Sequence, residues 1–347
     1  MIRPAVAALL ALFLSTPASA QLQAPRVDDL LPQSLQEANA AAVASSDGSE
    51  PGDAAYGAFQ RGYYLTALSL ALDRAAEGDA AAQTLVAEIY AGGLGVAQDL
   101  AAAAYWYALA SDNGDRLASF ELAMMYQEGR GVEKDRQRAA DLFLLAADRG
   151  SISAKYNLGL LHIEGIYAEP DLVRAAELIR EAADAGFAAA QYDYGTLLME
   201  GAGTRPDPEA AAEYIGLAAE QGLPAAQVEY AALLYLGRGI EQDREAAVRW
   251  YAKAAEAGNA VAQNRYAILL AAGEGVTLDL GEAAMWRALA RRQGLKDPKL
   301  DELLASIPPE ELERAEERAR FWPSEPPTAV AGGSAPALVP PATPATP

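Results

Sequence analysis

Residues able to carry out acid–base, nucleophilic or metal chemistry are scarce in this chain of 347 residues. It has one histidine, His162, and no cysteine. A histidine serves as a general base or metal ligand when a nucleophile, a carboxylate or a second ligand stands beside it. No His-Glu-x-x-His or Gly-x-Ser-x-Gly motif supplies such a partner. We therefore predict no catalytic residue, metal or cofactor, and interpret His162 as a core or groove-lining residue.

Two other patterns have a chemical and a structural interpretation. Paired glycines such as Gly93-Leu94-Gly95 could cradle phosphate, but they lack the Lys-Ser/Thr of phosphate loops and follow helical patterns. They are better explained as tight turns between helices, because glycine adopts positive φ without strain. Recurring Trp and Tyr residues, such as Trp106 and Trp250, could stack on sugars. Their fixed register with alanines favours a place in the core.

These patterns belong to an internal repeat of thirty-six residues. A glycine recurs at this period at seven positions: Gly78, Gly114, Gly150, Gly186, Gly222, Gly258 and Gly294. An aspartate does so at six: Asp99, Asp135, Asp171, Asp207, Asp243 and Asp279. A fixed period of this length indicates a stacked repeat array.

Each repeat is expected to hold two helices. In the first (helix A), Ala82, Val86, Ile89 and Tyr90 form one apolar face. The periodic aspartate is predicted to cap the second (helix B), and the periodic glycine to follow its end. Short helix pairs bury their apolar stripes only by stacking on one another. We therefore predict an all-α fold, an α/α superhelical solenoid of thirty-six-residue helix-turn-helix repeats.

The repeat resembles the Sel-one-like repeat, a relative of the tetratricopeptide repeat. The resemblance rests on Gly-x-Gly-hydrophobic-x-x-Asp in the turn, on Ala and Trp/Tyr in helix B, and on the junction Gly258-Asn259-Ala260-Val261-Ala262-Gln263. It departs at Gly165-Ile166-Tyr167, which lacks the second glycine. The resemblance implies a scaffold for protein–protein interaction.

Outside the repeats, the ends of the chain have distinct compositions. Arg3, an apolar run and Ala18-Ser19-Ala20 indicate a cleavable signal peptide with the cleavage site after Ala20, and hence a periplasmic or secreted protein. The predicted divisions are a signal peptide (1–20), a flexible arm (21–54), the repeat array (55–295, a degenerate first repeat plus six), capping helices (296–322) and a disordered Pro/Ala-rich tail (323–347).

The formal net charge of −21 argues against nucleic acid and anionic membranes as partners. The favoured function is a non-enzymatic adaptor that binds a protein or peptide on its concave surface. Binding of peptidoglycan or exopolysaccharide is the alternative, and hydrolysis of wall peptides or lactams is disfavoured by the missing catalytic residues.

The partner surface is predicted on helix A, at positions whose residue type varies between repeats, since a core position tolerates few side chains. These positions are Glu121, Met124, Asn157, Leu160, Asp193, Thr196, Glu229, Ala232 and Arg265. The mixture of acids and apolar groups suits a basic or amphipathic peptide. Ordinary solvated positions would show the same variation.

Overall fold

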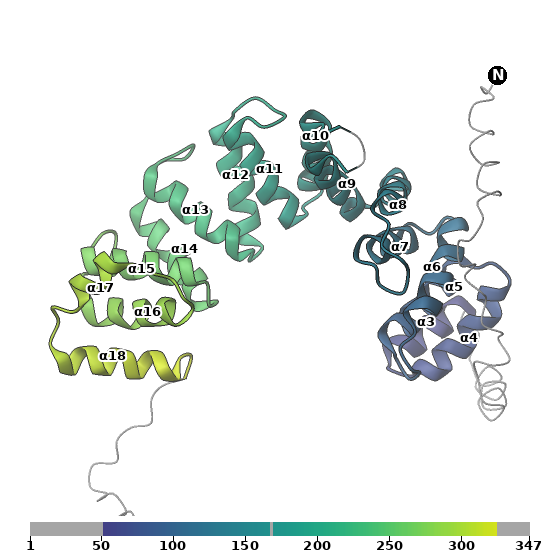
Figure 1. Cartoon of the computed structure of the whole chain (residues 1–347), viewed down its shortest axis with the longest axis horizontal. Coiled ribbons are helices and arrows are strands. Elements are labelled where there is room, and N and C mark those ends of the chain that lie inside the picture. Colours follow the sequence, from purple (N-terminus) through teal and green to yellow (C-terminus); the bar gives the residue numbers. More distant parts are fainter. Residues whose placement is uncertain (1–50, 167–168, 325–347) are drawn as a thin grey trace, which may run out of the picture. The chain divides into compact units, whose positions relative to one another are not determined.

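The computed structural model describes residues 51–166 and 169–324, which form sixteen helices and no strand (Figure 1). The predicted signal peptide, most of the N-terminal arm and nearly all of the C-terminal tail lie outside these residues. The chain divides into two compact units, Met1–Asp207 and Pro208–Pro347. The prediction of an all-α solenoid is confirmed.

The helices of the first unit are α3 (Pro51–Gln60), α4 (Tyr64–Ala76), α5 (Ala80–Gly92), α6 (Leu100–Asp112), α7 (Arg116–Glu128), α8 (Arg136–Asp148), α9 (Ile152–Glu164), α10 (Leu172–Asp184) and α11 (Ala188–Glu200). Those of the second are α12 (Pro208–Glu220), α13 (Pro224–Leu236), α14 (Arg244–Glu256), α15 (Ala260–Ala272), α16 (Leu280–Arg292), α17 (Pro298–Leu304) and α18 (Pro309–Phe321). Helix A of the repeats corresponds to α5, α7, α9, α11, α13 and α15, and helix B to the helix that follows each. Helix α3 begins inside the range predicted as an arm, so the helical part of the chain starts earlier than expected.

Five of the periodic aspartates cap helix B as predicted: Asp99, Asp135, Asp171, Asp243 and Asp279. The side chain of Asp99 accepts a hydrogen bond from the Ala102 amide at 2.9 Å, and that of Asp243 accepts one from Ala246 at 2.8 Å. At the other end, Gly114 follows α6 with a φ of 100°, in the left-handed region that favours glycine. Helix B thus begins and ends on residues of fixed type, and this keeps the repeat length constant.

Alanines form the seam between neighbouring helices. At two positions of helix B every repeat has a buried alanine: Ala103, Ala139, Ala175, Ala211, Ala247 and Ala283 at the first, and Ala110, Ala146, Ala182, Ala218, Ala254 and Ala290 at the second. A methyl side chain lets two helix backbones approach closely, so a larger residue at either position would force the pair apart.

A buried glutamine ties each helix A to the helix before it in four repeats. Gln83 donates from Nε2 to the carbonyl oxygen of Ala75 at 2.9 Å, and Gln191 does the same to Ala183 at 3.2 Å. Gln227 and Gln263 repeat the bond to Ala219 and Ala255. Each carbonyl lies in the last turn of its helix, and the glutamine amide adds a second bond to the one from the glycine that follows, as from Gly78 to Ala75 at 3.1 Å. The glutamine of the junction motif is therefore a structural residue.

In four of the turns the second glycine is required for contact between repeats as well as for the turn. A Cβ atom on Gly131 would lie 2.3 Å from the carbonyl oxygen of Leu100, at the start of the preceding helix B. At Gly203 and Gly275 the corresponding distances to Leu172 and Arg244 would be 1.9 Å and 2.6 Å. Any side chain at these places would clash with backbone. The chain has Tyr167 at the equivalent place in the fourth turn, outside the described residues.

Candidate binding surface

The structure places the predicted partner residues of the first unit on three helices. Glu121 and Met124 lie on α7, Asn157 and Leu160 on α9, and Asp193 and Thr196 on α11, and all six are half-buried. In the second unit, Glu229 and Ala232 on α13 are half-buried and Arg265 on α15 is exposed. Variation between repeats therefore marks partly accessible positions. Leu85, at the same repeat position as Glu121, is buried, so this position is not a surface position in every repeat.

Half-buried carboxyl groups characterise this surface in the first unit. Burial raises the pKa of Glu88 on α5, and the negative charge of Glu121 on α7 raises it further. Burial also raises the pKa of Glu121, which Arg130 partly offsets. The carboxylates are thus held where water stabilises them less well, and a cationic partner would compensate for this cost.

Tyr156 on α9 and Asp193 on α11 extend the acidic surface to the next repeat. The Tyr156 hydroxyl donates to Asp193 Oδ2 at 2.8 Å. Burial raises the pKa of Asp193, and this hydrogen bond works in the opposite direction. The Tyr156 ring also packs edge-on against Phe187, with 5.1 Å between ring centroids. These contacts fix the position of the Asp193 carboxylate.

A cavity of about 110 Å³ opens between α7, α8 and α9. We call it the Gln127 pocket; its lining residues are Gln127, Arg136, Ala139, Asn157, Leu160, Leu161, Glu164 and Ile166. The Oε1 atom of Gln127 is buried and has no hydrogen-bond partner among the described residues. A buried acceptor without a donor is costly, and because this oxygen is shielded from solvent, its missing partner is a cost to the stability of the fold.

The pocket contains two predicted residues, Asn157 and Leu160, and others that the sequence analysis missed. Gln127 is one of the missed residues, although the sequence contained a signal for it. At its repeat position the other full repeats have Ala91, Ile163, Met199, Tyr235 and Ala271, so a glutamine is the only amide in the series. A polar residue in an otherwise apolar series indicates a role that differs from packing.

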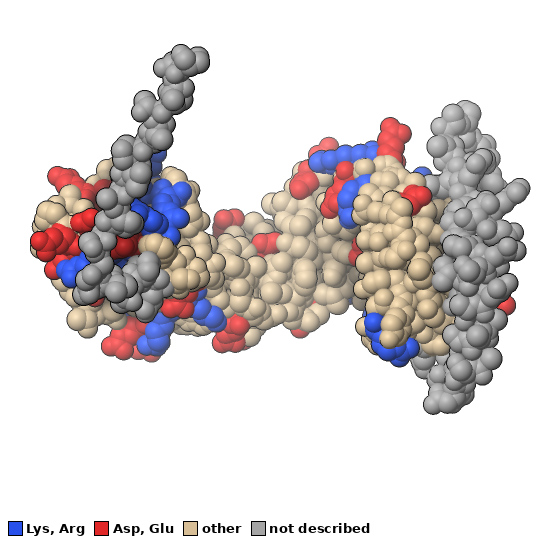
Figure 2. Space-filling view, turned by 90° about the horizontal axis from the view of Figure 1, so that it is seen from below, with Lys and Arg blue, Asp and Glu red and all other residues tan. Residues whose placement is uncertain are grey.

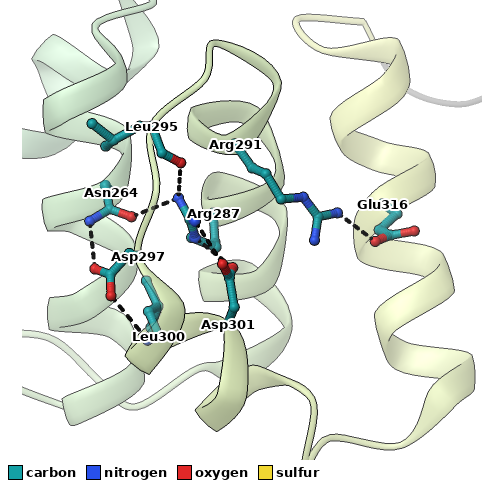
Figure 3. A network of polar contacts seen from close by, with 8 residues as sticks. All are labelled: Asn264, Arg287, Arg291, Leu295, Asp297, Leu300, Asp301 and Glu316. Carbon is teal, nitrogen blue, oxygen red and sulfur yellow. Dashed lines mark hydrogen bonds and ion pairs between the residues drawn. The ribbon is translucent and has the colours of Figure 1, made fainter.

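The C-terminal end of the second unit holds a separate polar network (Figure 3). The Arg287 guanidinium donates to both carboxylate oxygens of Asp301, at 2.7 and 2.8 Å, and to the Leu295 carbonyl at 2.9 Å. It also donates to Asn264 Oδ1 at 3.1 Å, while Asn264 Nδ2 donates to Asp297. Because these protein groups already satisfy the buried guanidinium, we interpret the network as structural.

The predicted capping helices cover the last repeat. Ala315 and Ala319 of α18 are buried, and the Trp322 ring packs edge-on against Trp286 of α16, with 4.8 Å between centroids. Trp106 and Trp286 are both buried, so neither ring is available for stacking on a sugar, whereas Trp250 is only half-buried.

His162 lies half-buried on α9. Across residues 51–166 and 169–324, no three His, Cys, Asp or Glu side chains are grouped as metal ligands would be. None of the helices described there is both long and apolar enough to cross a membrane. On the face shown in Figure 2, acidic and basic side chains are interspersed among broad uncharged areas.

The fold defines a helical repeat protein of the α-solenoid class. The model of the Sel1 repeat matches residues 80–115, 116–151, 152–187, 188–223, 224–259 and 260–295. The chain therefore belongs to the Sel1 repeat family, whose members are usually non-catalytic scaffolds for protein–protein interaction.

Solved structures agree with this assignment. A Sel1 repeat protein from Oxalobacter formigenes is 31% identical, with a TM-score of 0.63, and the match covers 70% of this chain and 99% of that one. A protective antigen present in uropathogenic Escherichia coli strains, which displays an SLR fold, is 24% identical with a TM-score of 0.51; the match covers 87% of this chain and 77% of that one. The second likeness supports the fold alone. No curated protein matches the chain.

Proposed function

We propose that the protein is an exported, non-enzymatic adaptor that binds a protein or peptide partner on the helix-A surface. The observation that carries this proposal is the row of half-buried carboxyl groups on α5, α7 and α11, together with the Gln127 pocket beside them. Groups held partly out of water at positions that differ between repeats are typical of a recognition surface. Their negative charge favours a basic or amphipathic segment.

Site-specific photo-crosslinking tests where the partner binds. A photoreactive residue is placed at Glu121 or Asp193 of the first unit's helix-A surface, or at the exposed position Gln137 on helix B as a matched control. After irradiation in the envelope fraction of the host, we expect the same cross-linked species from both helix-A positions and none from Gln137. With the photoreactive residue at Asp193, exchange of Glu88 and Glu121 for lysine should abolish the species. Equal cross-linking from Gln137, or a yield that survives the exchange, would contradict a helix-A site.

Export is a separate part of the proposal and rests on the sequence of residues 1–20. Determination of the N-terminal sequence of the protein isolated from its host tests it directly. We expect a mature chain that begins at Gln21 and is recovered from the periplasm or the medium. A cytoplasmic chain that retains residues 1–20 would contradict export and leave the binding surface unaffected.

A further inference from the structure

A chain of hydrogen bonds joins three successive helices in the first full repeat. Asn113, the residue that follows α6, donates from Nδ2 to Gln83 Oε1 on α5 at 2.9 Å. Gln83 in turn donates from Nε2 to the carbonyl oxygen of Ala75 on α4 at 2.9 Å. We call these three residues the Asn113 relay. It ties the end of α6 to the two helices before it.

The same arrangement recurs in the last repeat with a different amide. Gln293, the residue that follows α16, donates to Gln263 Oε1 on α15 at 2.9 Å. Gln263 donates to the carbonyl oxygen of Ala255 on α14 at 3.2 Å. Gln293 and Asn113 occupy the same repeat position, and each precedes a periodic glycine. The position therefore accepts either amide, but the two amides differ in chemical stability.

Asn113 and Gly114 form the one Asn-Gly pair in the sequence. Asparagine is a thermolabile residue, because its side chain can react with the main-chain nitrogen of the residue that follows. Glycine hinders this reaction least, since it has no Cβ atom. Asn113 is exposed, and a Cβ atom built on Gly114 would have nothing within 4 Å, so the peptide bond between them is unobstructed. A glutamine at this place, such as Gln293, would have to close a larger and less favoured ring.

The reaction needs no reagent other than solvent water. The Gly114 nitrogen attacks Cγ of Asn113 and forms a new C–N bond, while the bond from Cγ to Nδ2 breaks. Nδ2 leaves as ammonia with the proton lost from the Gly114 nitrogen, and the product is a cyclic imide. Water then opens the imide at either carbonyl carbon. One opening gives aspartate, and the other gives isoaspartate, in which the main chain runs through the side-chain carbons.

The fold slows this reaction without preventing it. Gly114 donates its amide hydrogen to the Ser111 carbonyl at 3.0 Å, and the Asn113 side chain is held by Gln83. Both bonds must open before the nitrogen can reach Cγ. They lie at the end of α6, and helix ends fray at a smaller cost in free energy than global unfolding. Local opening is therefore sufficient for the reaction.

We propose that Asn113 is a site of spontaneous deamidation, and that its conversion to an acid breaks the Asn113 relay. A carboxylate has no hydrogen to donate, so it would face Gln83 Oε1 as acceptor to acceptor. Gln83 is 3% exposed, and turning its amide toward the carboxylate would give up the bond to Ala75. The new charge also lies at the C-terminus of α6, where negative charge is unfavourable, and between Asp112 and Asp115.

Peptide mapping by mass spectrometry tests the chemistry. The folded protein is incubated at mildly alkaline pH in water enriched in heavy oxygen, which enters the product only when the imide opens during the incubation. We expect labelled aspartate and isoaspartate at position 113, and unchanged amides at Asn157, Asn259 and Gln293. A parallel sample unfolded in guanidinium chloride should convert faster at position 113. Conversion in the unfolded sample alone would overturn the proposal.

Three variants separate the relay from the added charge. Asn113→Asp reproduces one product and should lower the urea midpoint of unfolding. Asn113→Gln introduces the residue type of Gln293, so it should keep the natural midpoint and give no labelled product. Ala257→Asp is the matched control. Ala257 is also exposed, between the end of α14 and a periodic glycine, but its side chain makes no hydrogen bond that an acid could break.

The loss of stability should be larger for Asn113→Asp than for Ala257→Asp. An equal loss for the two variants, or an Asn113→Asp protein as stable as the natural one, would contradict the role of the relay. These measurements use no partner, so their outcome is independent of the adaptor proposal.

Discussion

Arg287 of α16 and Asp301 of α17 are joined by two parallel hydrogen bonds, from Nε to Oδ1 at 2.7 Å and from a terminal guanidinium nitrogen to Oδ2 at 2.8 Å (Figure 3). Arg287 is 3% exposed and occupies the helix-B position that Tyr107, Phe143 and Tyr251 hold in earlier repeats. The pair therefore joins the last helix of the array to α17, the first helix beyond it.

Asp301→Ala should destabilise the protein by about 2–4 kcal/mol, because it leaves the buried Arg287 guanidinium without its counter-charge. The measurement is chemical denaturation monitored by circular dichroism. Glu316→Ala is the control. It breaks the exposed pair with Arg291 and should cost less than about 1 kcal/mol. Equal losses for the two variants would show that burial of Arg287 does not distinguish the pairs.

Glu121→Gln should stabilise the protein at pH 7 by roughly a few tenths of a kcal/mol, a small value because the group is half-exposed. The folded-state pKa of Glu121 is raised above 4.5 by burial, so its ionised form costs stability at neutral pH. That cost disappears as the pH falls through the folded-state pKa. The variant's advantage in melting temperature should therefore vanish at about pH 4.

Glu181→Gln should change the stability in the opposite direction in the same measurement. Its hydrogen bond from Lys155 lowers the pKa of the Glu181 carboxyl group, so the carboxylate contributes stability above its unfolded pKa. This variant should be slightly less stable than the natural protein at pH 7, and the difference should shrink as the pH falls. If both variants shifted stability in one direction, the pKa shift of Glu121 would not be the cause.

Trp286→Ala and Trp250→Ala should differ in cost although the two residues share a repeat position. Trp286 is buried between Tyr266 and Trp322, so its loss should cost about 3–5 kcal/mol. Trp250 is half-buried against Tyr230 and under Lys253, and we expect about 1–2 kcal/mol. Urea denaturation of both variants measures the difference, and an equal cost would show that exposure at this position is unimportant.

Deletion of residues 308–322 should produce a protein that dimerises or loses solubility. Helix α18 buries only Ala315 and Ala319 of its own, yet it covers α16, including the ring of Trp286. Without it, an apolar face is left in water. Light scattering at two protein concentrations checks this expectation. The control is Arg318→Ala, which removes only the ion pair to Glu282. A truncated chain that stays monomeric and equally stable would show that α18 is not a cap.

The sequence by itself determined the repeat, the helices and their ends. Asp99 caps the helix that begins at the next residue, and its carboxylate accepts from an amide three residues on. Gly114 follows the end of the same helix, so each residue acts within one helical turn of its own position. Such local rules depend on residue type and spacing alone. The alanine seam was also predictable, since a constant residue at a constant period indicates a constant contact.

Only the tertiary structure decided which of the residues that differ between repeats lie close together in space. Gln127 and Asn157 each differ from the residues at the same position of the other repeats, and only the packing of α7, α8 and α9 places them around one cavity. Arg287 and Asp301 belong to different helices, and their pairing depends on the position of α17 beyond the last repeat. The repeated sequence determines the contacts that all repeats share, because each repeat meets the same kind of neighbour. A contact that occurs once depends on two specific surfaces meeting in space, and residue spacing does not encode it.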